Sequence, residues 1–128
     1  MIAVSIASTP DPPYTAVIFT SIRTDGDNGY AAASEAMDRL AAQQPGYLGV
    51  ESAREDVGIT VSYWASPEAA HAWKRVVDHR VVQKRGREEW YAQYQVRIAT
   101  VEREYGYSAD RSDSARRTTL TLAEQVLP

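Results

Sequence analysis

The sequence predicts an α+β fold built on an antiparallel sheet, and three features carry this prediction. Residues 14–23 (YTAVIFTSIR) have the β-branched composition and the alternation of a strand. Residues 30–44 are rich in alanine, and their apolar side chains recur at helical spacing. Residues 66–68 (Ser-Pro-Glu) carry the signals with which a second helix begins. Strand and helix patterns therefore follow one another along one short chain.

The first predicted strand is apolar on both faces. Ala16, Ile18 and Ile22 lie on one face, and Val17 and Phe19 lie on the other. A strand with two apolar faces is expected to be covered on both sides.

The first predicted helix follows a polar turn. Residues 24–29 (TDGDNG) have turn composition, and either Asp27 or Asn28 can cap the helix that begins at residue 30. Pro45-Gly46 ends this helix. Its apolar positions are Tyr30, Ala33, Met37, Leu40 and Ala41.

Two strands and two further helices are predicted next. Residues 47–55 and 58–64 form a hairpin joined across residues 56–57. The helix that begins at Pro67 has an inner face of Ala69, Ala70, Trp73, Val76 and Val77.

A break at Asp78-His79 separates this helix from a third one that runs through Tyr91, with Val82, Gly86 and Trp90 in approximate register. A last strand is predicted over residues 94–105. The order β-α-β-β-α-α-β is that of a ferredoxin-like split-βαβ protomer with an antiparallel sheet.

A chain of 128 residues has room for one domain. Three prolines in residues 9–13 indicate that residues 1–13 are an extended lead-in, and residues 14–107 form the domain. Residues 108–128 begin as a polar linker and end in a tail that regains apolar residues and could dock on a partner.

Composition excludes several classes of function. A net charge of −3 does not favour binding to nucleic acid or to an anionic membrane. The absence of cysteine excludes disulfides, thiolate metal sites and cysteine nucleophiles. The short, uncharged start of the chain is not typical of a secretory signal, and no segment is long enough to span a membrane. We therefore expect a cytoplasmic protein.

Four segments together resemble the antibiotic biosynthesis monooxygenase family: YTAVIFTSIRT, QPGYLGVES, GITVSYWASPEAAHAWK and RGREEWYAQYQVRIATVEREYGY. The resemblance covers about residues 14–107. Its most specific part is Tyr63-Trp64, then Ser66-Pro67-Glu68, then Trp73. The resemblance implies a dimeric α+β barrel, in which helices cover one sheet face and a second copy covers the other.

The wider superfamily includes cofactor-independent oxygenases, haem-degrading enzymes, isomerases and proteins of other roles, so fold alone does not choose among them. The haem-degrading branch has an axial histidine ten residues after the tryptophan that matches Trp73. Gln83 stands at this position, and an amide does not normally ligate haem iron. We therefore expect no haem, although His79 lies nearby as a conceivable substitute. Two histidines without cysteine, and no cluster of carboxylates, also predict no metal and no other cofactor.

Several residues are candidates for a substrate pocket. Trp64, Trp73 and Trp90 could wall a flat aromatic cavity. Packing of a helix on the sheet is the alternative for Trp73 and Trp90, and edge packing at a dimer interface is the alternative for Trp64. Gly86 on an inward helix face, beside Val82, would leave space for a ligand. Tyr63 and Tyr94 could donate hydrogen bonds to substrate oxygens, or serve in the core.

His79 is the expected catalytic base, because histidine exchanges a proton near neutral pH. A surface histidine beside Asp78 is the alternative. The function expected from the resemblance is cofactor-independent oxygenation of an aromatic, polyketide-like molecule. An isomerase, a cyclase and a non-catalytic ligand-binding protein of the same fold remain open.

Overall fold

The computed structural model describes residues 5–80 and 84–109, and it confirms the predicted order of elements. The third helical element is one turn of π-helix, here η1. The elements are β1 (Tyr14–Arg23), α1 (Tyr30–Ala42), β2 (Tyr47–Arg54), β3 (Gly58–Trp64), α2 (Pro67–Asp78), η1 (Gly86–Trp90) and β4 (Tyr91–Val101).

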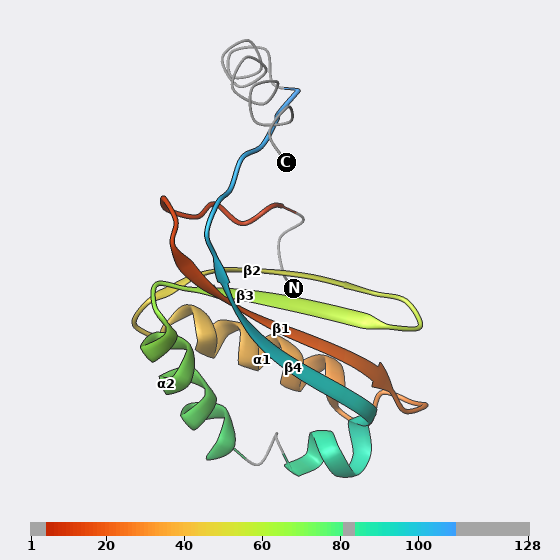
Figure 1. Ribbon diagram of the computed structural model, residues 1–128. Helices are drawn as coiled ribbons and strands as arrows, with labels where there is room; N and C mark the ends of the chain where they lie inside the picture. The colour runs from red at the N-terminus through yellow and green to blue at the C-terminus, as the bar shows by residue number, and fades with distance from the viewer. Residues whose placement is uncertain (1–4, 81–83, 110–128) are drawn as a thin grey trace.

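The four strands form one antiparallel sheet in the order β2-β3-β1-β4. Figure 1 shows α1, α2 and η1 on the same side of this sheet. The side that carries the helices is called the inner face below, and the other side is called the outer face. This is the α+β, ferredoxin-like protomer that the element order predicts.

Local signals explain where both long helices begin. The Asp27 carboxylate accepts hydrogen bonds from the backbone N–H groups of Gly29 and Ala31, at 3.0 and 3.1 Å. It therefore satisfies donors that the first turn of α1 leaves without helical partners. At the start of α2, Ser66 Oγ accepts from the N–H of Ala69 at 3.1 Å, and Pro67 occupies the first turn.

The predicted boundary between the third helix and the last strand was wrong. Helix was expected through Tyr91 and strand from residue 94, but β4 begins at Tyr91 and ends at Val101. Tyr91 pairs with Arg23 of β1, and its ring packs edge-on against Phe19 with centroids 5.3 Å apart. These sheet contacts place Tyr91 in the strand, because tertiary packing outweighs the local helical pattern.

The segment before β1 contacts β2 and the segment after β4 on the outer face. The N–H of Ala7 donates to Glu51 of β2 at 2.9 Å, and Thr9 donates to Glu104 at 2.6 Å. The predicted tail lies outside the described residues from residue 110 onward, and residues 102–109 extend away from the sheet (Figure 1). Among the described helices, none is both long and apolar enough to cross a bilayer.

Candidate functional site

A cavity of about 560 Å³ lies between the helices and the inner face of the sheet. This volume falls in the range of small-molecule sites. Most of its lining is apolar, and seven aromatic side chains from both helices, η1 and the sheet contribute to it. They are Phe19, Tyr30, Tyr47, Trp73, Trp90, Tyr91 and Tyr94.

The register of the strands builds the floor of the cavity. Alternate residues of a strand share one face, and directly paired residues lie side by side on that face. Val17 pairs with Ser62 and with Ile98, and all three line the cavity. The next inward row consists of Phe19, Thr60 and Val96. Two hydroxyl side chains on β3 therefore interrupt an otherwise apolar floor.

The cavity is exposed to solvent along β4. Helix α1 packs mainly against β2, and α2 packs against β1 and β3. On β4, the cavity-lining side chains of Val96 and Ile98 are 43% and 57% exposed. Ligands can therefore enter beside this edge strand, over an apolar surface.

Trp73 forms a wall of the cavity and is held from behind by Trp64. Trp64 is completely buried, and its ring stacks on that of Trp73 with centroids 5.7 Å apart. Its indole Nε1–H donates to Ser62 Oγ at 2.9 Å. The Tyr47 ring packs edge-on against the Trp64 ring, with centroids 5.6 Å apart. Trp64 thus belongs to the core and does not line the cavity itself.

Trp90 closes the end of the cavity that η1 forms. Its indole Nε1–H donates to the Asn28 carbonyl at 2.9 Å, and Arg85 lies over its ring at 4.8 Å. Gly86 is buried beside it, and a Cβ there would meet the ring of Tyr91 at 3.3 Å. A glycine therefore allows the Tyr91 ring to pack against η1. A π-turn is uncommon in proteins and often occurs at a functional site.

Burial changes the proton affinity of several groups at the cavity. It raises the pKa of the Asp38 carboxyl above its ordinary value. Burial, followed by the nearby Asp38 charge, raises the pKa of Tyr47. Burial and a hydrogen bond with Tyr30 raise the pKa of Tyr91. Both tyrosines are therefore neutral hydrogen-bond donors at neutral pH.

A second carboxylate at the cavity is engaged in an ion pair. Lys74 Nζ lies 2.7 Å from Asp78 on α2, and both residues line the cavity. The positive charge of Lys74 and the negative charge of Asp78 therefore neutralise each other at this side of the cavity.

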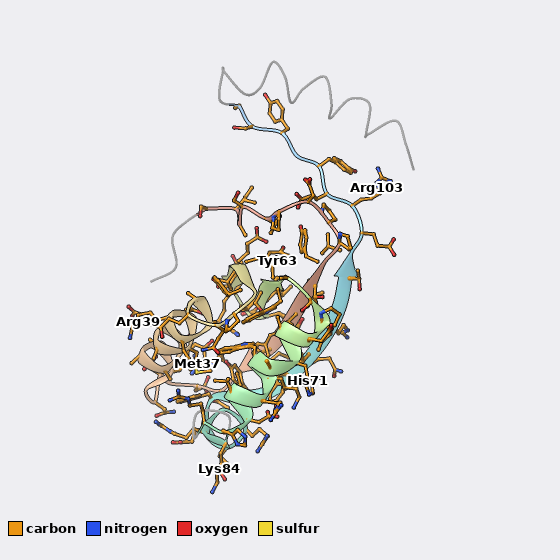
Figure 2. All side chains as sticks on the ribbon, turned by 90° about the vertical axis from the view of Figure 1, so that its left-hand side faces the viewer. Met37, Arg39, Tyr63, His71, Lys84 and Arg103 are labelled. Atoms are coloured by element: carbon orange, nitrogen blue, oxygen red, sulfur yellow. The ribbon has the colours of Figure 1, made fainter. Side chains whose placement is uncertain are left out.

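The structure brings four of the predicted site residues to the cavity: Trp73, Gly86, Trp90 and Tyr94. Tyr63 lies on the outer face, where its hydroxyl donates to Glu51 at 2.7 Å. Figure 2 shows Tyr63 close to the N-terminal lead-in. Val82 lies outside the described residues.

His79 caps the C-terminal end of α2, where it is exposed, and it is not among the residues that line the cavity. Its role as a base therefore stays a prediction. His71 is also exposed, on the outward side of α2 (Figure 2).

Sequence reasoning missed the polar residues that α1 contributes. Ser34 and Asp38 line the cavity together with Met37. Helical spacing could have found them, because Ser34 and Asp38 follow Tyr30 by four and eight residues on one helix face. The apolar face was assigned from apolar residues alone.

One family model and one sequence relative each match more than half of this chain. The model of the family described as "Antibiotic biosynthesis monooxygenase" matches residues 13–85. The uncharacterized protein YqjZ of Bacillus subtilis is 46% identical over 110 residues, which cover 84% of this chain and 96% of that protein.

Two solved structures show the same fold at low sequence identity. A protein from Nitrosomonas europaea superposes with a TM-score of 0.58 at 12% identity, covering 79% of this chain and 99% of that one. SnoaB, a cofactor-independent oxygenase from Streptomyces nogalater, gives 0.56 at 11% identity, covering 71% and 95%.

Proposed function

Because the chain belongs to the antibiotic biosynthesis monooxygenase family, we propose that it oxygenates a flat aromatic molecule in its cavity without a bound cofactor. The observation that carries the proposal is the cavity itself, which combines aromatic walls with a few titratable groups. Aromatic side chains that enclose an apolar space favour a planar, apolar ligand.

The proposed chemistry needs a substrate that supplies its own electrons. Removal of one proton from an anthrone-like CH2 group gives an electron-rich carbanion, which can transfer electrons to O2. The net change converts CH2 to C=O, with one oxygen atom in the product and the other in water. The substrate loses four electrons and O2 gains four, so no further reductant is required. The protein orients the substrate and accepts the proton.

Three kinds of side chain support this role. Trp73 and Trp90 can hold the rings of a planar ligand from two sides of the cavity. Tyr94 can donate a hydrogen bond to a substrate oxygen, as can Ser62, whose oxygen already accepts from Trp64. The exposed apolar side chains of Val96 and Ile98 on β4 can contact the part of a ligand that extends toward solvent.

A homodimer is part of the proposal. No helix packs on the outer face among the described residues, yet this face carries exposed apolar side chains. Ile22 and Ile59 are 41% and 46% exposed there. A second copy that packs its sheet on this face would bury them and complete a barrel.

The proposal is tested with 1,8-dihydroxyanthrone as the probe. Purified protein is first treated with a chelator, and its metal, flavin and haem contents are measured. We expect quenching of tryptophan fluorescence on binding, and consumption of one O2 per quinone formed, above the rate without protein. The Trp73→Ala variant should lose most of the binding. The exposed Tyr107→Phe variant serves as control.

Each other outcome identifies a different function. Conversion of the probe without O2 uptake would replace oxygenation by isomerisation or cyclisation. Binding without conversion would favour a ligand-binding protein. Absence of binding would overturn the proposed site.

A further inference from the structure

We propose that Asp38 of α1 is the group that accepts the substrate proton in this cavity. The inference rests on the proposed function, because it assumes that the cavity holds the reacting molecule. It assigns the base to a residue on the first helix, and not to His79 at the end of α2.

The position of Asp38 carries the inference. It lines the cavity on the face of α1 that also presents Ser34 and Met37. In the part of the chain that the structure describes, the Asp38 carboxylate forms no hydrogen bond and no ion pair. Its oxygens are therefore open to a donor on a ligand.

The other titratable groups at the cavity are less suited to this role. Asp78 is paired with Lys74 at 2.7 Å. Tyr47 and Tyr91 have raised pKa values, and a neutral phenol is a poor base. His79 is exposed and outside the lining. Asp38 is thus the lining carboxylate that is both half-buried and available.

The partial burial of Asp38 also suits a base. Partial burial is the largest influence on the pKa of the Asp38 carboxyl, and it disfavours the ionised form. Arg39 is engaged with Glu35 at 3.0 Å. From β2, Tyr47 faces Asp38, and from α2 the paired Lys74 and Asp78 line the same cavity. A carboxylate with a raised proton affinity matches the proton affinity of an acidic phenol or CH group more closely.

The assigned step is a single proton transfer. The substrate O–H or C–H bond breaks, its electron pair stays on the substrate, and the proton forms a new O–H bond on the Asp38 carboxylate. The carboxyl becomes neutral and the substrate becomes an anion. The proton later returns to the reduced oxygen or to solvent, which restores the carboxylate.

The first test uses 4-nitrophenol, whose protonated and ionised forms absorb at different wavelengths. A nearby carboxylate holds the phenol proton in a hydrogen bond and opposes ionisation of the probe. We therefore expect the pKa of the bound probe to fall by about one unit in Asp38→Asn relative to the original protein. Glu55→Gln removes an exposed carboxylate at the turn between β2 and β3, outside the cavity lining, and should leave the probe unchanged. An equal probe pKa in the original protein and Asp38→Asn would overturn the inference.

The second test measures O2 uptake with 1,8-dihydroxyanthrone. Asp38→Asn should lower kcat by about 100-fold or more, with little change in the Kd of the probe. The decline of kcat toward low pH should disappear, and Asp38→Glu should restore part of the rate. His79→Ala should keep its rate. Loss of activity in His79→Ala with normal activity in Asp38→Asn would return the base to His79.

The two tests separate this inference from the proposed function. A probe shift that depends on Asp38, without any O2 uptake, supports Asp38 as the proton acceptor and overturns oxygenation. Failure of the original protein to bind either probe overturns both.

Discussion

The rings of Trp64 and Trp73 stack at a centroid distance of 5.7 Å, with 23° between their planes. Trp64 belongs to β3 and is fully buried, whereas Trp73 belongs to α2 and lines the cavity. This pair joins the sheet to the helix that covers it. Stability and ligand binding should therefore depend on different members of the same stack.

Substitution of Trp64 should mainly affect stability. Trp64→Ala would leave a void in the core, and we expect a loss of about 3–5 kcal/mol in the free energy of unfolding. Trp73→Ala should cost less stability, because Trp73 is only partly buried, but should weaken ligand binding more. Urea unfolding and fluorescence titration with 1,8-dihydroxyanthrone measure the two effects. A larger stability loss for Trp73→Ala would contradict this division.

Gly46 is predicted to be intolerant of any side chain. It has a φ of +82°, and a Cβ there would lie 2.6 Å from the Cβ of Ala69 in α2. Gly46→Ala should therefore destabilise the protein through both backbone strain and collision. Gly26→Ala is the matched control, because Gly26 has a φ of +79° with no contact closer than 3.6 Å. The control should cost about 1–2 kcal/mol, and Gly46→Ala clearly more, in thermal or urea unfolding. Equal losses in the free energy of unfolding for the two variants would show that neighbouring atoms shift and relieve the collision at residue 46.

Much of the fold could be predicted from local signals. The Ser66-Pro67 start of α2 and the alternation of β1 are properties of short segments, and both elements have the predicted bounds. The junction of η1 and β4 could not be predicted in this way. The strand begins at Tyr91 because the ring meets Phe19 and Tyr30, which are distant in the sequence.

The candidate site was predictable mainly where it is aromatic. Trp73 and Trp90 stood out by composition, and both line the cavity. Asp38 did not, because a single carboxylate on a helix usually faces solvent. Only the folded structure, in which the sheet lies against α1, shows that Asp38 lines the cavity. His79 was favoured for its chemistry, while its location at the end of α2 depends on helix length.

Tyr63 should make stability sensitive to alkaline pH. Burial and the hydrogen bond to Glu51 raise its pKa in the folded state. A raised pKa gives stability that is present below the ordinary tyrosine value of about 10 and is lost as pH rises toward the folded value. Tyr63→Phe should therefore lose about 1 kcal/mol at neutral pH and show a weaker decline of stability above pH 10. Unfolding midpoints across this pH range measure it, with exposed Tyr107→Phe as control. An unchanged alkaline decline would assign it to other groups, such as Tyr91.

Ile59 should control assembly if the outer face is an interface between two copies. It is 46% exposed, and its pairing with Thr20 of β1 and Ala53 of β2 places it on a central strand of that face. A lysine there is tolerated by a monomer in water, but in a dimer it would bury a charge without a partner. Ile59→Lys should therefore shift the protein from dimer to monomer in light scattering. Val57→Lys is the matched control, because Val57 is 48% exposed but lies at the hairpin turn outside the strand pairing. A dimer that survives Ile59→Lys, or an original protein that is already monomeric, would contradict an interface on this face.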